Sequence, residues 1–109
     1  KGKIEIAVSA NSLDIQGYWW SNYEIKTEEI EEVELTENFQ TGTRTNGFSG
    51  ANLLQGEFKN KEQGKYTLYA YKDCKASIIL HTKKGDVVIN EKTEKETREL
   101  YHEIEKILK

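Results

Sequence analysis

The chain has 109 residues, of which 36% are hydrophobic, and this suits a single domain with one modest core. A formal net charge of −3 argues against nucleic-acid binding by the chain as a whole. No apolar run approaches the ~20 residues that span a bilayer, and no secretory signal is visible.

The first predicted elements are short strands in which apolar and polar side chains alternate. Residues 3–8 and 12–16 both show this period of two, and the turn-forming residues 9–11 between them indicate a hairpin. Gly17 then interrupts the pattern. The aromatic content of residues 18–25 favours a third strand.

An acidic segment and a glycine-rich tract follow. The sequence predicts a short turn at residues 27–30 and a strand from about residue 31 to 36. Residues 41–58 match neither glycine pattern that surrounds a phosphate with backbone amides. We therefore expect a long loop between two strands, folded over a barrel with Phe48, Leu53 and Leu54 turned inwards.

The second half of the chain contains the most apolar strands. Residues 65–72 alternate along their length, and residues 73–75 make a tight connection to the apolar strand 76–82. Gly85 suits a hairpin turn at residues 83–86, after which residues 87–90 form the returning strand.

The last segment has the period of an amphipathic helix. Thr93 and Glu96 match the capping box, in which each side chain satisfies a backbone donor of the first turn. The apolar stripe consists of Thr97, Leu100, Tyr101, Ile104, Ile107 and Leu108.

These elements predict a mainly β domain of about seven antiparallel strands capped by one C-terminal α-helix. A sheet this small has too little apolar area to bury both of its faces. It is therefore expected to curl into a barrel or split barrel whose open end the helix closes.

The second half of the chain resembles the bacterial pleckstrin-homology-like (PH-like) family. The resemblance rests on the order and spacing of several segments between about residues 44 and 108, and the first 40 residues match more loosely. In chain order the segments are 45-TNGFSG-50, 56-GEF-58, Gly64 with 66-YTLYAYK-72, 78-IILHTKKGDVVIN-90, and the helix from Thr93.

This resemblance implies a seven-stranded, partly open barrel with a helical cap, and a non-catalytic role. Domains of this family often lie beside transmembrane helices. Because the chain has no Met and begins with Lys1, we expect residues 1–109 to be a single PH-like domain of a longer protein at the cytoplasmic face of a membrane. The turn at residues 9–11 has no Lys or Arg, which argues against the inositol-phosphate binding of eukaryotic relatives.

Few residues suggest catalysis or metal binding. His81 and His102 are the only histidines, and neither belongs to a zinc-binding pattern. Cys74 is the only cysteine, which fits a reducing compartment, and it belongs to no recognisable nucleophile pair. The glutamates lie in charge runs typical of solvated faces. We therefore expect no enzyme activity, no cofactor and no metal.

Two features favour contact with a partner. Residues 18–23 hold the densest aromatic cluster, and on a strand Trp19 and Trp20 would point to opposite faces, one inwards and one outwards. Lysines predominate from residue 59 to 84. The residues expected to contact a partner or a lipid are Trp19, Trp20, Tyr23, Arg44, Phe48, Lys59 and Lys61.

Three functional hypotheses remain. The first is a non-catalytic PH-like interaction domain that mediates protein–protein contact or oligomerisation next to a membrane. The second is a peripheral binder of anionic lipid that uses the lysine-rich hairpins. The third is a small barrel that binds an apolar ligand, which requires a deep pocket with converging polar groups.

Overall fold

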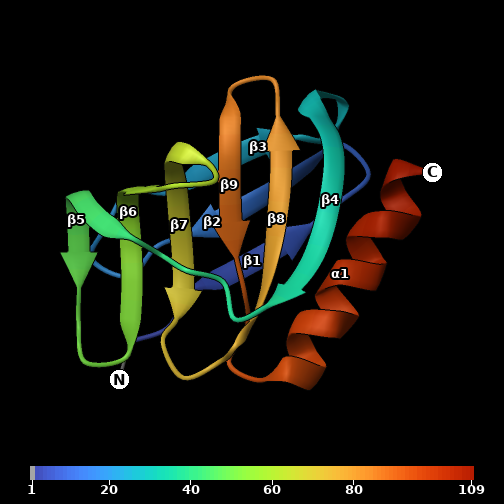
Figure 1. Cartoon of the computed structure of the whole chain (residues 1–109). Coiled ribbons are helices and arrows are strands. Elements are labelled where there is room, and N and C mark those ends of the chain that lie inside the picture. Colours follow the sequence, from blue (N-terminus) through green and yellow to red (C-terminus); the bar gives the residue numbers. More distant parts are fainter. Residues whose placement is uncertain (1) are drawn as a thin grey trace.

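A computed structural model describes residues 2–109, which form nine strands, a short 3₁₀ turn and one α-helix (Figure 1). The predicted mainly β, PH-like architecture is confirmed, with nine strands in place of about seven. The strands are β1 (Glu5–Val8), β2 (Ser12–Gln16), β3 (Tyr23–Lys26), β4 (Ile30–Glu37), β5 (Thr43–Ser49), β6 (Leu53–Asn60), β7 (Gly64–Tyr71), β8 (Ala76–Thr82) and β9 (Gly85–Ile89). The 3₁₀ turn η1 covers Thr27–Glu29, and helix α1 covers Glu94–Leu108.

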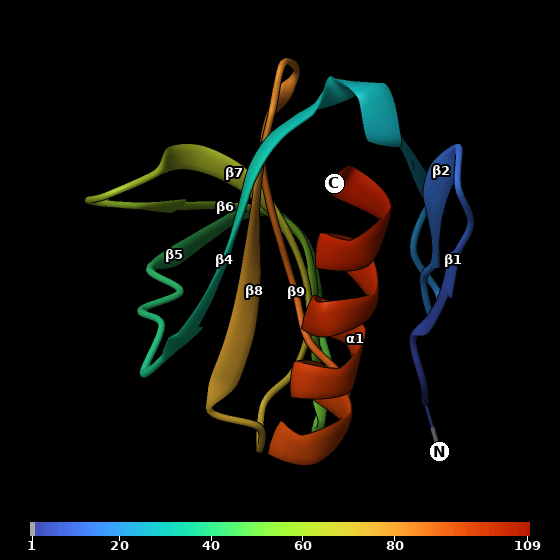
Figure 2. The same cartoon turned by 90° about the vertical axis from the view of Figure 1, so that its right-hand side faces the viewer.

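The strands form two sheets. A small antiparallel sheet has the order β1-β2-β3, and a large sheet has the order β4-β8-β9-β7-β6-β5. Figure 2 shows the two sheets facing each other with α1 between them. Within residues 2–109, no helix has both the length and the apolar content needed to cross a membrane.

One strand pair departs from the predicted antiparallel arrangement. β7 and β9 are neighbours at the centre of the large sheet and run parallel. The reason is topological, because the β8–β9 hairpin folds back so that β9 lies between β8 and β7. β9 thus meets a strand whose direction it shares.

The aromatic segment 18–25 is a strand only from Tyr23 onwards, so the prediction for residues 18–22 was wrong. Trp19 has a φ of 57°, in the left-handed region that an extended strand does not use. The backbone of Tyr18 bonds to the side chain of Gln55 on β6 instead of to a neighbouring strand.

The predicted loop at residues 41–58 is also wrong, because most of this tract is the β5–β6 hairpin. Gly47 pairs with Gly56 across the two strands. Gly56 has a φ of 123°, and a Cβ at this position would collide with the carbonyl oxygen of Asn46. These glycines therefore allow a close approach of two paired strands, as at a bulge. Leu53 does turn inwards as expected, whereas Phe48 and Leu54 are half-buried.

Both faces of the large sheet carry apolar clusters, contrary to the expectation of one buried face. The main core lies between the sheets and includes Tyr69 and Tyr71 of β7. The outer face has a second cluster, which the β4–β5 connection crosses (Figure 1). Phe39 of this connection packs edge-on against Tyr66, at 5.6 Å between ring centroids. The buried members of the second cluster are Phe58, Tyr66, Leu68, Ala70, Ile79 and Val88.

The helix is buried as predicted, but only the Thr93 half of the predicted capping box forms, because the Glu96 carboxylate accepts a hydrogen bond from the Thr93 hydroxyl at 3.3 Å. The Thr93 side chain accepts a hydrogen bond from the Glu96 backbone nitrogen at 3.1 Å. Leu100 and Ile104 are buried in the main core, and α1 contacts β4 and β8. Ile107 of the predicted stripe is only half-buried.

Replacing Ile104 by Ala is expected to lower the free energy of unfolding by about 2–5 kcal/mol, because it opens a cavity where no side-chain surface reaches water. Ile107→Ala makes the same chemical change at a half-buried position and should cost roughly 1 kcal/mol or less. Urea unfolding followed by circular dichroism measures both. Equal losses for the two variants would contradict the packing described for α1.

Candidate interaction surface

The loop of residues 17–22, between β2 and β3, presents an exposed tryptophan. Trp19 is 79% exposed and is the one large apolar side chain with this degree of exposure among residues 2–109. Its ring lies 6.1 Å from that of Tyr18, which in turn lies 6.5 Å from Phe48 on β5. Tyr18, Trp19 and Phe48 are called the aromatic surface below.

The large sheet holds this loop in place. Gln55 of β6 is fully buried, and its amide nitrogen donates to the Tyr18 carbonyl at 2.7 Å. Its side-chain oxygen accepts from the Tyr18 backbone nitrogen, also at 2.7 Å. One buried amide thus satisfies both backbone groups of the residue before Trp19, as a neighbouring strand would.

Two tyrosines of β7 bind segments that flank the strands of the small sheet in a similar way. The Tyr69 hydroxyl donates to the Ser21 carbonyl at 2.5 Å, and burial raises its pKa to about 12, so it stays protonated as a donor. The Tyr71 hydroxyl accepts from the Ile4 backbone nitrogen at 2.8 Å and donates to the Ile4 carbonyl at 3.0 Å. The loop and the residue before β1 are therefore fixed by polar contacts that cross the core.

The structure separates the seven expected contact residues. Trp19 and Phe48 belong to the aromatic surface, whereas Trp20 and Tyr23 are half-buried and pack against the main core. The remaining three are exposed cations at the opposite end of the β5–β6 hairpin from Phe48. These three are Arg44, Lys59 and Lys61.

The lysine-rich hairpins meet on one side of the large sheet. Lys65 of β7 and Lys84 of the β8–β9 turn line one shallow depression together with Glu57 and Asp86. The Lys84 ammonium also lies 3.4 Å from a Glu29 carboxylate oxygen. Acidic groups therefore accompany the lysines at this depression.

Sequence reasoning missed Gln55, because a single polar residue in a strand gives no sign of a partner 37 positions away. Gln55→Leu should destabilise the fold, since it leaves both Tyr18 backbone groups unpaired at about 1–3 kcal/mol each. Hydrogen exchange of the Tyr18 backbone amide should be faster in this variant than in the wild type. Gln16→Leu, at an exposed position of β2, is the control. Unchanged protection of the Tyr18 amide in Gln55→Leu would show that the loop is held by other contacts.

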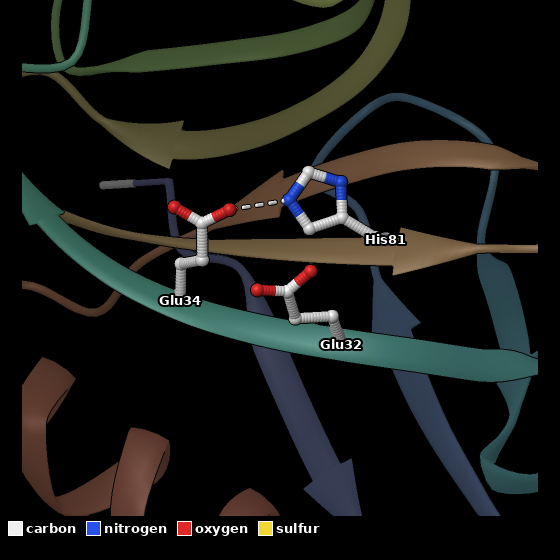
Figure 3. Close-up of side chains that lie close together, drawn as sticks. All are labelled: Glu32, Glu34 and His81. Atoms are coloured by element: carbon white, nitrogen blue, oxygen red, sulfur yellow. Dashed lines mark hydrogen bonds and ion pairs between the residues drawn. The ribbon is translucent and has the colours of Figure 1, made fainter.

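Sequence reasoning also missed the charged partners of His81. The Nε2 atom of His81 lies 2.6 Å from a carboxylate oxygen of Glu34 (Figure 3). The Nδ1 atom of His81 lies 2.9 Å from a carboxylate oxygen of Asp86. Burial lowers the pKa of His81, but the hydrogen bonds and charges of the two carboxylates together outweigh it. The pKa of His81 is therefore raised above its usual 6.5.

A histidine whose pKa is higher in the folded state than in the unfolded state stabilises the fold fully at pH values below its unfolded-state pKa. This stabilisation is lost as the pH rises through its folded-state pKa. In buffer containing a chelator, His81→Gln should therefore destabilise the protein more at pH 6 than at pH 8.5. The losses of unfolding free energy at the two pH values should differ by less than about 1 kcal/mol, as for other partly exposed ion pairs. His102→Gln, at an exposed position of α1, is the control. Thermal unfolding at both pH values measures the effect, and a larger loss at pH 8.5 would contradict it.

Comparison with known families identifies this architecture. A family model described as Bacterial PH domain matches residues 4–104. The matched segment includes all nine strands and most of α1. No curated protein and no solved structure gives a match. The chain therefore belongs to the bacterial PH domain family.

Proposed function

We propose that this PH domain is a non-catalytic interaction module that contacts another protein through the aromatic surface. The observation that carries the proposal is the 79% exposure of Trp19 on a loop fixed by Gln55. Exposed tryptophans leave a large apolar area in water, and tryptophan is enriched among the residues that dominate binding energy. A rigid support lowers the entropy lost when such a side chain is immobilised in a complex.

The backbone at Trp19 supports the same interpretation. A left-handed φ costs a residue with a Cβ about 1 kcal/mol or more, and such residues concentrate at functional sites. The indole of this residue is exposed to solvent and is not part of the core. The fold thus accepts both a strained backbone and an exposed ring at the same residue.

A strand edge lies beside the aromatic surface. β5, which carries Phe48, is an edge strand of the large sheet in the described part of the chain (Figure 1). An extended segment of a partner can add to such an edge through backbone hydrogen bonds, while pockets or rings nearby select its side chains. Trp19 and Tyr18 are placed to make that selection.

A non-catalytic role agrees with the family, whose domains are generally binding modules. The apolar-ligand hypothesis receives no support, because side chains of both sheets and of α1 pack into one cluster where a barrel ligand would lie. A place at the cytoplasmic face of a membrane, within a longer protein, stays a prediction.

Anionic lipid binding is the second candidate, favoured by the convergence of Lys65 and Lys84 on one depression. The neighbouring Glu29, Glu57 and Asp86 weaken it, since they reduce the positive potential that attracts a lipid surface. Flotation with vesicles containing anionic lipid tests this candidate. Salt-dependent binding that Lys65→Ala and Lys84→Ala abolish would favour it over protein contact.

The protein-contact proposal is tested by a photo-cross-linking amino acid at position 19, in the bacterium that encodes the chain. Position 99, exposed on α1, is the control. A discrete protein adduct formed from position 19 and not from position 99 is expected. Once the adduct identifies the partner, Trp19→Ala should weaken its binding roughly 30-fold in titrations with both purified proteins. Identical adducts from both positions, or unchanged affinity, would overturn the proposal.

A further inference from the structure

Three potential metal ligands meet on the outer face of the large sheet. Glu32 and Glu34 are two residues apart on β4, so their side chains point to the same face. His81 of β8 pairs with Glu32 in the β4–β8 register. One ligand atom from each of the three residues lies within 4.8 Å of the other two (Figure 3).

Asp86 fixes the orientation of the imidazole. It is the β9 residue paired with His81, and its carboxylate accepts from Nδ1 at 2.9 Å. A carboxylate bonded to one ring nitrogen is the usual support of a metal-binding histidine, because it sets the tautomer and aims the other nitrogen at the ion. Here the other nitrogen, Nε2, faces Glu34 at 2.6 Å.

Acidic side chains outnumber basic ones in this group. Three carboxylates, from Glu32, Glu34 and Asp86, surround one imidazole. Glu32 makes no side-chain hydrogen bond or ion pair with any other residue from 2 to 109. Hydrogen bonds of His81 hold Glu34 and Asp86, whereas the exposed carboxylate of Glu32 takes part in neither bond and is free to bind an ion.

We propose that Glu32, Glu34 and His81 bind a divalent transition-metal ion such as Zn²⁺, with Asp86 as a positioning residue. One imidazole nitrogen and two carboxylates form a donor set that suits Zn²⁺ better than Mg²⁺ or Ca²⁺. The ion takes the place of the proton between Nε2 and Glu34. Three protein ligands leave a coordination position for water or for a group of a partner.

This site is independent of the aromatic surface, and it departs from the expectation of no metal. That expectation considered ligand spacing along the chain, whereas Glu34 and His81 lie 47 positions apart and only the pairing of β4 with β8 brings them together. A bound ion would also link the edge strand β4 to β8. Binding should therefore slow hydrogen exchange of the β4 amides (Ile30–Glu37).

The test is isothermal titration of chelator-treated protein with Zn²⁺, with Mg²⁺ for comparison. We expect one Zn²⁺ per chain and a rise in Tm of roughly 4–8 °C at zinc concentrations about ten-fold above Kd. His81→Gln should abolish binding, and Asp86→Asn should weaken it about 10- to 100-fold. His102→Gln, at the other histidine of the chain, should bind as the wild type does.

Glu32→Gln separates a metal site from a plain histidine–carboxylate ion pair. Because Glu32 is exposed and takes no part in the His81 hydrogen bonds, this variant should keep the stability of the metal-free protein and lose zinc affinity. It also remains informative if His81→Gln fails to fold. The proposal is overturned if the wild type binds no Zn²⁺ up to about 1 mM, or if Glu32→Gln binds as tightly as the wild type.

Discussion

The apolar stripe of α1 must be covered by protein, and the two sheets supply that cover. Leu100 and Ile104 are buried among side chains of both sheets, and α1 lies directly against β4 and β8. Figure 2 shows the helix occupying the space at which the sheets separate. Each buried aliphatic side chain contributes about 1.5–3 kcal/mol, so the helix supplies a substantial part of the free energy that holds the two sheets around one core.

Polar contacts then fix the small sheet to the large one. Tyr69 and Tyr71 reach across the core to the backbone of Ser21 and Ile4, and Gln55 does the same for Tyr18. Such groups are costly to bury unless every one is paired, and here the pairing partners are backbone atoms of segments outside regular strands. The tyrosine-rich character of β7 thus has a structural cause. The exposure of Trp19 depends on the same contacts, because they hold the loop while leaving its indole outside the core.

The charged group around His81 depends on a different constraint, the register of antiparallel pairing. A shift of one residue in the β4–β8 register would turn Glu32 and Glu34 to the other face, where the core lies. The apolar residues of β4 exclude that shift, since Ile30, Val33 and Leu35 would then leave the main core. Burial on one face of the sheet therefore determines which charges meet on the other.

Local patterns of the sequence determined the strand 12–16, the strand 76–82, the capped helix and the mainly β class, because alternation, helical periodicity and capping are properties of neighbouring residues. Family resemblance added the PH-like architecture. Only tertiary structure decided that residues 18–22 form a loop, that residues 41–58 contain a hairpin, and that β9 runs parallel to β7. It also decided which side chains meet at Trp19 and at His81. Each of these outcomes depends on contacts between residues far apart in the chain, such as Gln55 with Tyr18 or Glu34 with His81, and no pattern within a short window encodes them.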